Sequence, residues 1–373
     1  MNTNVVMQKK QKLFFVISSL NGGGAQRVLI SLANHFAQLK CEVVVIALNY
    51  EEPSYAIDKR VEVVYLLNER RPQLWHRAYC MFQTFFKLTS LLHKKKPDCA
   101  VAFITSANLW TGITCSLAGV PFIVSERTSP NRTVNQFNFL LKRIAAILYK
   151  KSSAVVVSAK GVEDCMLENN AFKNLTNISR ITNAVPVFKT PSDTRVHNRR
   201  FILGVGRLAF VKGFDQLIEA YHLAGVRDAD LLIVGDGEER DNLVVQIASL
   251  GLSDRVKLLG SKPNLQDYYS QAEIFVLPSR NEGYPNALVE AMSLGCPSIA
   301  MDCEFGPSEI IDDGRNGLLV KDNTVIGLSE MISTLIDDPA LKANLSKEAG
   351  YINYTNSADR IFKKWENLIL KHA

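Results

Sequence analysis

The sharpest chemical pattern in this chain is a pair of glutamates eight residues apart, Glu282 and Glu290. Glu282 follows an apolar run that predicts a strand, and Glu290 lies two turns inside the predicted next helix. Eight residues of helix span about 12 Å, so we expect the carboxylates to contact different parts of one extended ligand. At the helix start, the N–H groups of Asn286, Ala287 and Leu288 suit a phosphate. An ordinary helix with one exposed glutamate is the alternative.

Two cations form a second candidate site for an anionic ligand. Arg207 and Lys212 stand five residues apart, after one predicted strand and just before the predicted helix 214–223. They can converge on a diphosphate, because arginine bonds phosphate bidentately and lysine adds a point charge. Two solvated surface cations are the alternative.

A glycine run forms the third pattern. Gly22, Gly23 and Gly24 follow the first apolar run and open the predicted helix 25–39. Glycines let backbone N–H groups approach a phosphate or sugar at a helix start. The run is not a G-x-G-x-x-G, and no suitable acid follows the second predicted strand, so a nicotinamide dinucleotide site is not expected. A simple tight turn is the alternative.

Parallel sheets are needed to position these residues. Runs that are apolar throughout alternate with helical patterns, which predicts an α/β doubly wound architecture covered on both faces. In the first half the expected strands are Leu13–Leu20, Val43–Leu48, Val61–Leu66, Cys99–Ile104, Pro121–Val124 and Ala154–Ser158. In the second half they are Phe201–Gly206, Leu231–Gly235, Val256–Leu259, Ile274–Leu277 and Ser298–Met301.

The chain is expected to form two domains. Its 373 residues exceed one compact core, and the alternation of strands and helices restarts after a polar segment, 183–200, that reads as a hinge linker. We expect an N-terminal domain over residues 1–183 and a C-terminal domain over 184–358, facing a cleft. Ligands in such sheets bind beyond the carboxyl ends of the strands.

The net charge of +6 is unevenly divided. Residues 1–183 carry 23 basic and 11 acidic side chains, and residues 184–373 carry 20 and 26. We therefore expect an anionic membrane surface or another polyanion to meet only the first half. Two acid-free basic stretches are Arg70–Lys96, which includes Trp75 and several other aromatic residues, and Arg127–Lys160. They suit an anionic membrane or a lipid diphosphate, with a core-facing helix as the alternative; nucleic acid is not expected.

The chain offers no cysteine or histidine pattern for a metal. Its seven cysteines are odd in number and include no C-x-x-C pair, which predicts reduced thiols in a cytosolic protein. The first apolar run lacks a cleavage site, so export is not expected. The uncharged stretch Cys99–Ser125 is expected to form a strand, a helix and a strand rather than a membrane span.

Taken in order, these motifs resemble those of the family 4 retaining glycosyltransferases, which have the GT-B fold. The resemblance covers nearly the whole chain and is most specific in the second half. The motifs that carry it are 22–28, Gly206-Arg207, Lys212-Gly213, 234–237, 282–290, 306–311 and 314–320.

The resemblance implies a role for each site residue. Arg207 and Lys212 would hold the nucleotide diphosphate of a sugar donor, Glu290 the ribose hydroxyls, and Glu282 the donor sugar. The Gly22–Gly24 loop would close over phosphate and sugar from the opposite domain. The C-terminal helix, 359–373, would return to the first domain.

One departure concerns Ser125-Glu126-Arg127, where many family members carry a histidine near the donor sugar. This form resembles a subgroup assigned to hexose or N-acetylhexosamine transfer onto polyprenyl-diphosphate-linked saccharides. Either Glu126 or Arg127 contacts the sugar in place of the histidine, or the two form a structural salt bridge at the strand end.

The function expected from this resemblance is transfer of a sugar from a nucleotide sugar, expected to be UDP-linked, to a lipid-linked saccharide at the cytoplasmic face of the membrane. The site residues include no Asp-x-Asp motif for Mg²⁺, so fixed cations are expected to stabilise the leaving diphosphate and no metal cofactor is expected. A nucleotide-sugar epimerase of the same fold and a non-catalytic partner subunit are the alternatives.

Overall fold

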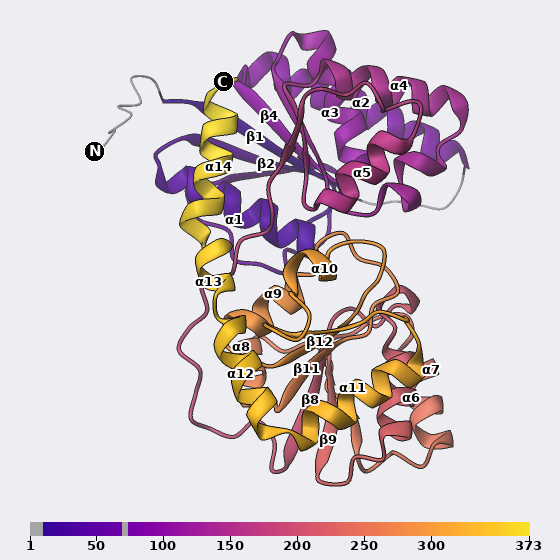
Figure 1. The fold of residues 1–373 in the computed structure, drawn as a ribbon. Helices are drawn as coiled ribbons and strands as arrows, with labels where there is room; N and C mark the ends of the chain where they lie inside the picture. Colours follow the sequence, from indigo (N-terminus) through magenta and orange to yellow (C-terminus); the bar gives the residue numbers. More distant parts are fainter. Residues whose placement is uncertain (1–9, 69–73) are drawn as a thin grey trace. The chain divides into compact units, whose positions relative to one another are not determined.

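The structure, a computed structural model, describes residues 10–68 and 74–373, with side chains described from residue 77 onward in the second range. The chain divides into two compact units (Figure 1). The first contains Met1–Thr182 and Ile361–Ala373, and the second contains Asn183–Arg360. The boundary expected after residue 183 lies one residue from this division, and the one expected after residue 358 lies two residues from it.

The first unit is built on a parallel sheet. Its seven described strands lie in the order β3-β2-β1-β4-β5-β6-β7. The strands are β1 (Lys12–Ile17), β2 (Glu42–Asn49), β3 (Glu62–Leu67), β4 (Cys99–Phe103), β5 (Phe122–Glu126), β6 (Ala154–Val157) and β7 (Ile178–Arg180). The helices are α1 (Gly24–Gln38), α2 (Leu74–Lys95), α3 (Thr105–Ala118), α4 (Phe139–Lys151) and α5 (Lys160–Glu168), joined by the last part of α14 (Ala358–Leu370).

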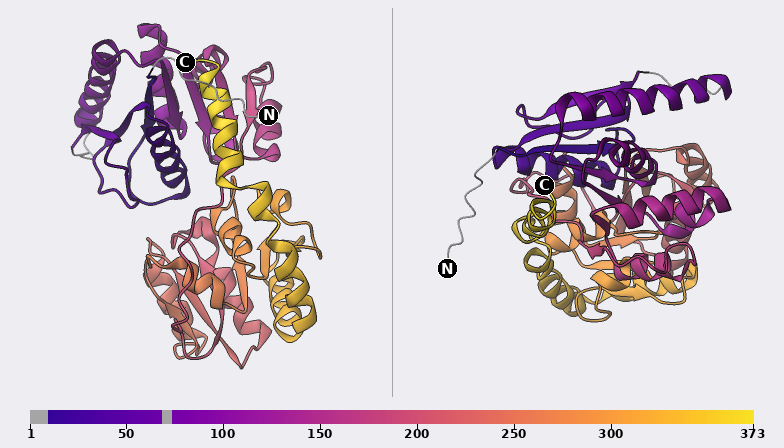
Figure 2. Two further views of the ribbon diagram at one scale, coloured as in Figure 1. Left: turned by 90° about the vertical axis from the view of Figure 1, so that its left-hand side faces the viewer. Right: turned by 90° about the horizontal axis from the view of Figure 1, so that it is seen from above.

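Strands β1 and β4 show why this sheet is covered on both faces. Every residue of β4 is buried, and so is every residue of β1 after the first. A strand that is apolar on both sides needs a helix layer on each face. Figure 2 shows this arrangement, with the strands of the first unit between the layer that holds α2 and the layer that holds α14.

The second unit repeats the plan. Its six described strands lie in the order β10-β9-β8-β11-β12-β13 and are all parallel. They are β8 (Arg200–Val205), β9 (Ala229–Val234), β10 (Val256–Leu258), β11 (Ile274–Leu277), β12 (Ser298–Met301) and β13 (Leu318–Val320). The helices are α6 (Phe214–Ala224), α7 (Arg240–Ser249), α8 (Leu265–Gln271), α9 (Asn286–Ser293), α10 (Pro307–Ile310), α11 (Val325–Asp337), α12 (Pro339–Ala349) and α13 (Ile352–Thr355).

The two sheets confirm the predicted α/β class and each of the predicted strands, with small differences at their ends. The uncharged stretch forms β4, α3 and β5, as expected. Two edge strands of three residues each, β7 and β13, were not predicted. None of the helices in the described ranges is long and apolar enough to span a bilayer.

The segment expected to be a hinge linker is irregular, but it is bonded to the second unit. The backbone N–H of Ser192 donates to Asp267, and that of Val196 donates to Gln271. Both acceptors lie on α8. These bonds hold residues 192–196 of the segment to α8, and the hinge role of the segment stays a prediction.

The C-terminal helix packs inside the first unit. A carboxylate oxygen of Glu366 lies 2.8 Å from Nε2 of His35 on α1, and the indole of Trp365 stacks on Phe103 with ring centroids 5.6 Å apart. Trp365 is almost fully buried. The last helix therefore completes the core of the domain with which the chain begins.

Candidate functional site

The candidate site in the second unit lies where the strand order reverses. Strands β9 and β10 extend the sheet on one side of β8. Strand β11, which comes later in the chain, pairs with β8 on its other side. Loops that follow neighbouring strands at such a point diverge and leave room for a ligand. The loops concerned are 206–213, after β8, and 278–285, after β11.

Lys212 and Glu282 meet across these two loops. The ammonium of Lys212 donates to Oε1 of Glu282 at 2.6 Å, and the hydroxyl of Ser279 donates to the same oxygen at 2.7 Å. Glu282 is buried, whereas Lys212 is partly exposed. The structure thus brings together two residues that the sequence analysis placed in separate motifs.

Gly213 makes the contact between the loops possible. Its φ of +68° lies in the left-handed region, and a Cβ placed on it would lie 2.1 Å from the carbonyl oxygen of Pro278. Only a residue without a side chain fits there. The turn that carries Lys212 therefore packs backbone to backbone against the loop that carries Glu282.

Arg207 lies on the loop after β8 and is exposed. Within residues 10–68 and 77–373 its guanidinium has no hydrogen bond or ion pair. Its loop is held by a second close approach, since a Cβ on Gly235 would lie 1.9 Å from the carbonyl oxygen of Gly206. The loop thus presents an available cation on a well-packed backbone, an arrangement suited to an anionic ligand.

The start of α9 lies directly after the Glu282 loop. Asn286 is its first residue, and no side chain caps the helix. The first N–H groups of a helix have no partner within it, so those of Asn286, Ala287 and Leu288 can bind an anion. The side-chain oxygen of Asn286 accepts a hydrogen bond from Asn183 at 2.7 Å, which orients this end of the helix.

Glu290 is buried on the inner side of α9 and is 3% exposed. A buried carboxylate needs a partner, and Tyr269 on α8 donates its hydroxyl to Oε2 of Glu290 at 3.1 Å. Sequence reasoning missed Tyr269 because it lies 21 residues earlier and its helix gives no local signal. The tyrosine orients the carboxylate that the resemblance assigns to ribose.

The glycine loop of the first unit forms the start of α1. Gly22 and Gly23 have φ angles of +57° and +81°, which glycine adopts without strain. The N–H of Gly22 donates to the hydroxyl of Ser54, and the Tyr55 hydroxyl donates to the carbonyl of Gly23. Gly24 is the first helical residue. The loop is thus anchored in a left-handed conformation at the carboxyl end of β1.

Glu126 lies in the core of the first unit and is 1% exposed. Its carboxylate accepts hydrogen bonds from three neutral side chains, those of Thr105, Asn108 and Tyr149. Burial raises the pKa of Glu126, and these bonds oppose the rise. The structure places Glu126 among structural partners, and its predicted role as a sugar contact stays a prediction.

Arg127, the next residue, lies between aromatic rings. Its guanidinium carbon is 4.9 Å from the ring centroid of Phe103 and 5.4 Å from that of Trp365, and Nη1 donates to the carbonyl of Ile181. Burial lowers the pKa of Arg127 to about 9. A cation over two rings stabilises the packing of α14 on β4. Its predicted sugar contact likewise stays a prediction.

One Asp-x-Asp triplet, Asp228-Ala229-Asp230, lies outside the motifs discussed above. It stands at the amino end of β9, whereas the candidate site lies at the carboxyl ends of the strands. Asp228 forms an ion pair with Arg200, and Asp230 with Arg255. Both carboxylates are therefore paired with arginines, and the triplet is part of an ion-pair network.

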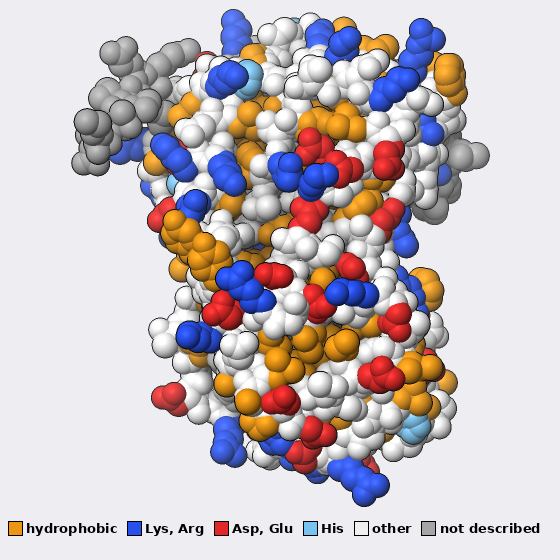
Figure 3. Space-filling view, in the orientation of Figure 1, with side chains coloured by type: hydrophobic (Ala, Val, Ile, Leu, Met, Phe, Trp, Pro, Cys, Tyr) orange, Lys and Arg blue, Asp and Glu red, His pale blue; other side chains and the backbone are white. Residues whose placement is uncertain are grey.

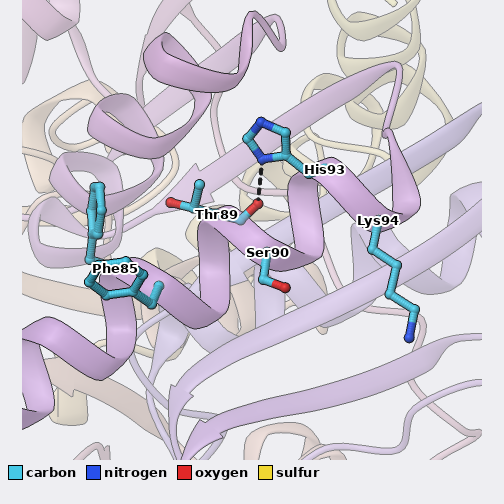
Figure 4. A pocket seen from close by; sticks show the side chains of 6 residues that line it. Phe85, Thr89, Ser90, His93 and Lys94 are labelled. Carbon is cyan, nitrogen blue, oxygen red and sulfur yellow. Dashed lines mark hydrogen bonds between the residues drawn. The ribbon is translucent and has the colours of Figure 1, made fainter.

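A hollow lies on the side of α2 and shares no residue with the candidate site. Figure 4 shows that the residues labelled there all come from this one helix, with Nδ1 of His93 donating to the carbonyl of Thr89. The hollow is lined by Phe85, Phe86, Thr89, Ser90, His93 and Lys94. Its lining includes two phenylalanines and a lysine, which belong to the basic aromatic stretch noted in the sequence.

Two family models match successive parts of the chain. Residues 22–187 match the model described as Glycosyltransferase Family 4, and residues 189–350 match the model described as Glycosyl transferases group 1. Together the two matches span every motif discussed above, including Ser125-Glu126-Arg127.

Similar curated proteins cover nearly the full length. The amylovoran biosynthesis glycosyltransferase AmsD of Erwinia amylovora is 26% identical over 96% of this chain and 99% of its own. An α-1,4-N-acetyl-D-galactosaminyltransferase of Campylobacter jejuni, named for a saccharide on undecaprenol diphosphate, is 26% identical over 96% and 98%. An uncharacterised glycosyltransferase of Haemophilus influenzae is 25% identical over 95% and 99%.

Solved structures share the fold. The sucrose-phosphate synthase of Thermosynechococcus elongatus has a TM-score of 0.81 at 18% identity, over 97% of this chain and 98% of its own. HepE of Anabaena, solved in complex with UDP, has a TM-score of 0.78 at 22% identity, over 97% and 100%. These likenesses establish the two-domain fold expected from the sequence.

Proposed function

Because the chain belongs to the group 1 and family 4 glycosyltransferases and has their GT-B fold, we propose that it transfers a hexose or N-acetylhexosamine from a UDP-sugar to a lipid-linked saccharide. The proposed transfer retains the anomeric configuration and serves the synthesis of a cell-surface polysaccharide, O-antigen or glycoprotein glycan. The observation that carries the proposal is the contact between Lys212 and Glu282 at the strand-order reversal of the second unit, with the exposed Arg207 on the same loop as Lys212.

The cations serve the leaving group. When the bond between the anomeric carbon and the β-phosphate oxygen breaks, its electron pair passes to the phosphate, and positive charge develops on the sugar. The guanidinium of Arg207 is exposed and available for this charge, and Lys212 lies five residues later on the same loop. The N–H groups at the start of α9 add a third source of positive charge, because the N-terminus of a helix carries a partial positive charge. We propose that these groups stabilise the departing diphosphate without a metal ion.

We propose that the two glutamates contact different parts of the donor, Glu282 the sugar and Glu290 the ribose. Glu282, at the end of β11, stands beside the cation that would hold the phosphate, so its carboxylate is placed for the donor sugar. Glu290 lies eight residues further along, oriented by Tyr269, and suits the ribose hydroxyls. One acceptor oxygen forms the new bond to the anomeric carbon, and its proton passes to the departing phosphate. This last step, and hence retention, rests on the family resemblance.

The acceptor class is inferred from relatives and from the surface of the first unit. Two Campylobacter jejuni relatives are named for acceptors on undecaprenol diphosphate. Such an acceptor lies at a membrane, and the first unit carries the excess of basic residues. Arg70 and Arg71, and the side chain of Trp75, which belonged to the predicted basic aromatic stretch, lie outside the described residues and side chains.

Helix α4 carries the surface that we propose faces the membrane. Four of its apolar side chains are exposed at helical spacing, and we call them the α4 stripe: Phe139, Leu140, Ile144 and Ile147. Three exposed cations flank the stripe, namely Arg143, Lys150 and Lys151. Figure 3 shows hydrophobic and basic side chains next to each other on this part of the first unit, toward the upper right.

This pattern suits a peripheral contact with anionic lipid. An apolar stripe flanked by cations buries its apolar part in the interface while its cations meet lipid headgroups. Helix α4 contacts α3, and α3 contacts α2, so the exposed aromatics of α2, including Phe82 and Phe86, belong to the same helix layer. We propose that this layer holds the enzyme at the cytoplasmic face of the membrane, where the lipid-linked acceptor is found.

One experiment tests the proposed function. Purified protein is incubated with a panel of UDP- and GDP-sugars and polyprenyl-diphosphate-linked saccharides, with and without EDTA. Sugar appearing on the lipid, at the same rate in EDTA, supports the proposal. An isomerised free nucleotide sugar would instead indicate an epimerase. Nucleotide binding without turnover would indicate a non-catalytic partner subunit.

A further inference from the structure

Arg280 is a residue of the Glu282 loop for which the proposed chemistry has no use. It stands two residues before Glu282, and its guanidinium does not turn toward that carboxylate. Nη1 and Nη2 donate to the two carboxylate oxygens of Asp215 at 2.7 and 2.6 Å. Asp215 lies in the first turn of α6, just after the turn that carries Lys212. Arg280 thus connects the two loops of the candidate site by a bidentate ion pair.

Two more contacts hold Arg280 to the same turn. Nη1 also donates to the carbonyl of Phe210 at 2.8 Å, and the guanidinium carbon lies 4.1 Å from the centroid of the Phe210 ring. The backbone N–H of Arg280 donates to the carbonyl of Val211 at 2.9 Å. These contacts bracket Lys212, since they reach the two residues before it and the aspartate three residues after it.

The position of Lys212 depends on this turn. The segment Phe210–Lys212 is a single 3-10 turn with no buried side chain of its own. Phe210 is 61% exposed, so it does not anchor the turn in the core. Apart from the close backbone approach at Gly213, a short surface turn of this kind has little packing to order it. The contacts from Arg280 add to that order, and a planar guanidinium fork suits a bidentate partner and a stacked ring at once.

We propose that Arg280 is a positioning residue: through Asp215 and the Phe210–Val211 backbone it sets the place of Lys212 relative to Glu282. It acts through Lys212 and does not itself bind the donor. This inference rests on the proposed function, in which Lys212 holds the diphosphate. A misplacement of about 1 Å at a reacting group can cost about 100-fold in rate, so such a support has a measurable effect.

The competing role for Arg280 is direct binding of phosphate, and Asp215 separates the two. If Arg280 only positions the turn, Asp215→Ala breaks the support and weakens UDP binding, as Arg280→Ala does. If Arg280 binds phosphate, Asp215→Ala frees the guanidinium, and UDP binding stays equal or tightens. The sign of the Asp215→Ala effect therefore decides between them.

The experiment measures UDP affinity by calorimetry, transfer kinetics, and hydrogen exchange of the 207–213 segment. We expect Arg280→Ala and Asp215→Ala each to weaken UDP binding about 10-fold and lower kcat/KM about 100-fold. The double variant should lose no more UDP affinity or kcat/KM than the more impaired single variant, because the two residues act as one unit. Exchange in the segment should accelerate in all three. Arg280→Lys keeps one ion pair but loses the fork, and an intermediate effect is expected.

A matched control lies in the same domain. Arg200 forms a bidentate pair with Glu273, at 2.9 and 3.0 Å, at the amino ends of β8 and β11. Arg200→Ala should lower the melting temperature and leave UDP affinity and exchange of the 207–213 segment unchanged. Unchanged affinity and exchange in Arg280→Ala, tighter binding in Asp215→Ala, or additive losses in the double variant would each overturn the positioning role.

Hydrogen exchange also separates this inference from the proposed function. It needs no substrate, so it reports on the turn even if the wild-type protein transfers no sugar. Failure of the wild type in the substrate panel would refute the proposed function alone. Unchanged exchange in folded Arg280→Ala would refute the positioning role alone.

Discussion

The ammonium of Lys212 lies 2.6 Å from a carboxylate oxygen of Glu282, although the two residues are 70 positions apart in the chain. They meet because β8 and β11, which precede them, are neighbours in the sheet. A cation and a carboxylate in contact at the carboxyl ends of parallel strands can hold two adjoining parts of a donor, its phosphate and its sugar. The following predictions test this arrangement and its surroundings.

Removal of either partner should abolish most turnover. We expect Lys212→Ala and Glu282→Ala each to lower kcat by about 100- to 1,000-fold, because each loses a group placed where charge develops. Steady-state kinetics with a UDP-sugar donor measures the effect. Lys342 and Glu273 form an ion pair of similar length away from the site, at 2.7 Å, so Lys342→Ala is the matched control. Near-normal activity in both site variants would contradict the assignment of Lys212 and Glu282 to the active site.

Glu290 should make the protein bind UDP more tightly than a nucleotide that lacks the ribose hydroxyls. We expect Glu290→Gln to weaken UDP binding about 10-fold but to weaken binding of 2′,3′-dideoxy-UDP much less, because a hydrogen bond to a charged group is lost only with UDP. Tyr269→Phe should show a smaller effect in the same direction, since it removes only the hydroxyl that orients the carboxylate. Equal losses for both nucleotides would show that Glu290 does not contact the ribose.

Gly213→Ala should damage the site far more than its backbone strain alone predicts. Gly213 and Gly225 have similar φ angles, +68° and +61°, but only at Gly213 would a Cβ meet another atom, the Pro278 carbonyl oxygen at 2.1 Å. Gly225→Ala should cost about 1 kcal/mol of stability from the left-handed backbone and leave UDP affinity unchanged. Gly213→Ala should cost more and also lose UDP binding. Similar behaviour of the two variants in calorimetry and thermal melts would contradict the close packing of the loops.

Glu126 should make stability depend on pH in an unusual direction. Burial raises its pKa in the folded protein above the ordinary value of 4.5. The folded protein therefore holds this proton more tightly than the unfolded chain. The resulting stabilisation is fully present below pH 4.5 and is lost as pH rises through the raised pKa.

The corresponding variant is Glu126→Gln, which has no charge to bury. Thermal unfolding between pH 5 and 8 should show a smaller loss of stability with rising pH in this variant than in the wild type. Glu42→Gln is the control, because Glu42 is partly exposed beside Lys12. The same pH dependence in the wild type and in Glu126→Gln would rule out this account of the buried carboxyl.

The α4 stripe should govern membrane binding. The double variant Ile144→Glu, Ile147→Glu places two charges where apolar side chains are proposed to enter the interface, and vesicle binding should fall by about 10-fold or more. Sedimentation with anionic and neutral vesicles measures this. Val244 and Val245 are also exposed, on α7 of the other unit, so their replacement by glutamate controls for net charge. Equal binding of the wild type to neutral and anionic vesicles would argue against the electrostatic part of the proposal.

Much of the fold was predictable because the strands are buried on both faces. A segment such as β4, apolar at every position, can lie only inside a covered parallel sheet, and its alternation with helical patterns identifies the doubly wound class. The same logic placed Gly22, Arg207 and Glu282 after strands, at the end of the sheet where ligands bind. These properties depend on local composition and spacing, which the sequence shows directly.

The partners of these residues depended on the tertiary structure. Nothing in the spacing indicated that Lys212 meets Glu282, that Tyr269 orients Glu290 or that Arg280 pairs with Asp215, because each pair joins residues brought together by strand order or helix packing. The same holds for Glu126, which the resemblance suggested as a sugar contact because many family members carry a histidine there. Its burial among Thr105, Asn108 and Tyr149 arises from helices packed over β5. The sequence by itself determined which residue types follow which strands; only the packing of sheet and helices decided which of them touch, because contact depends on chain topology rather than on periodicity.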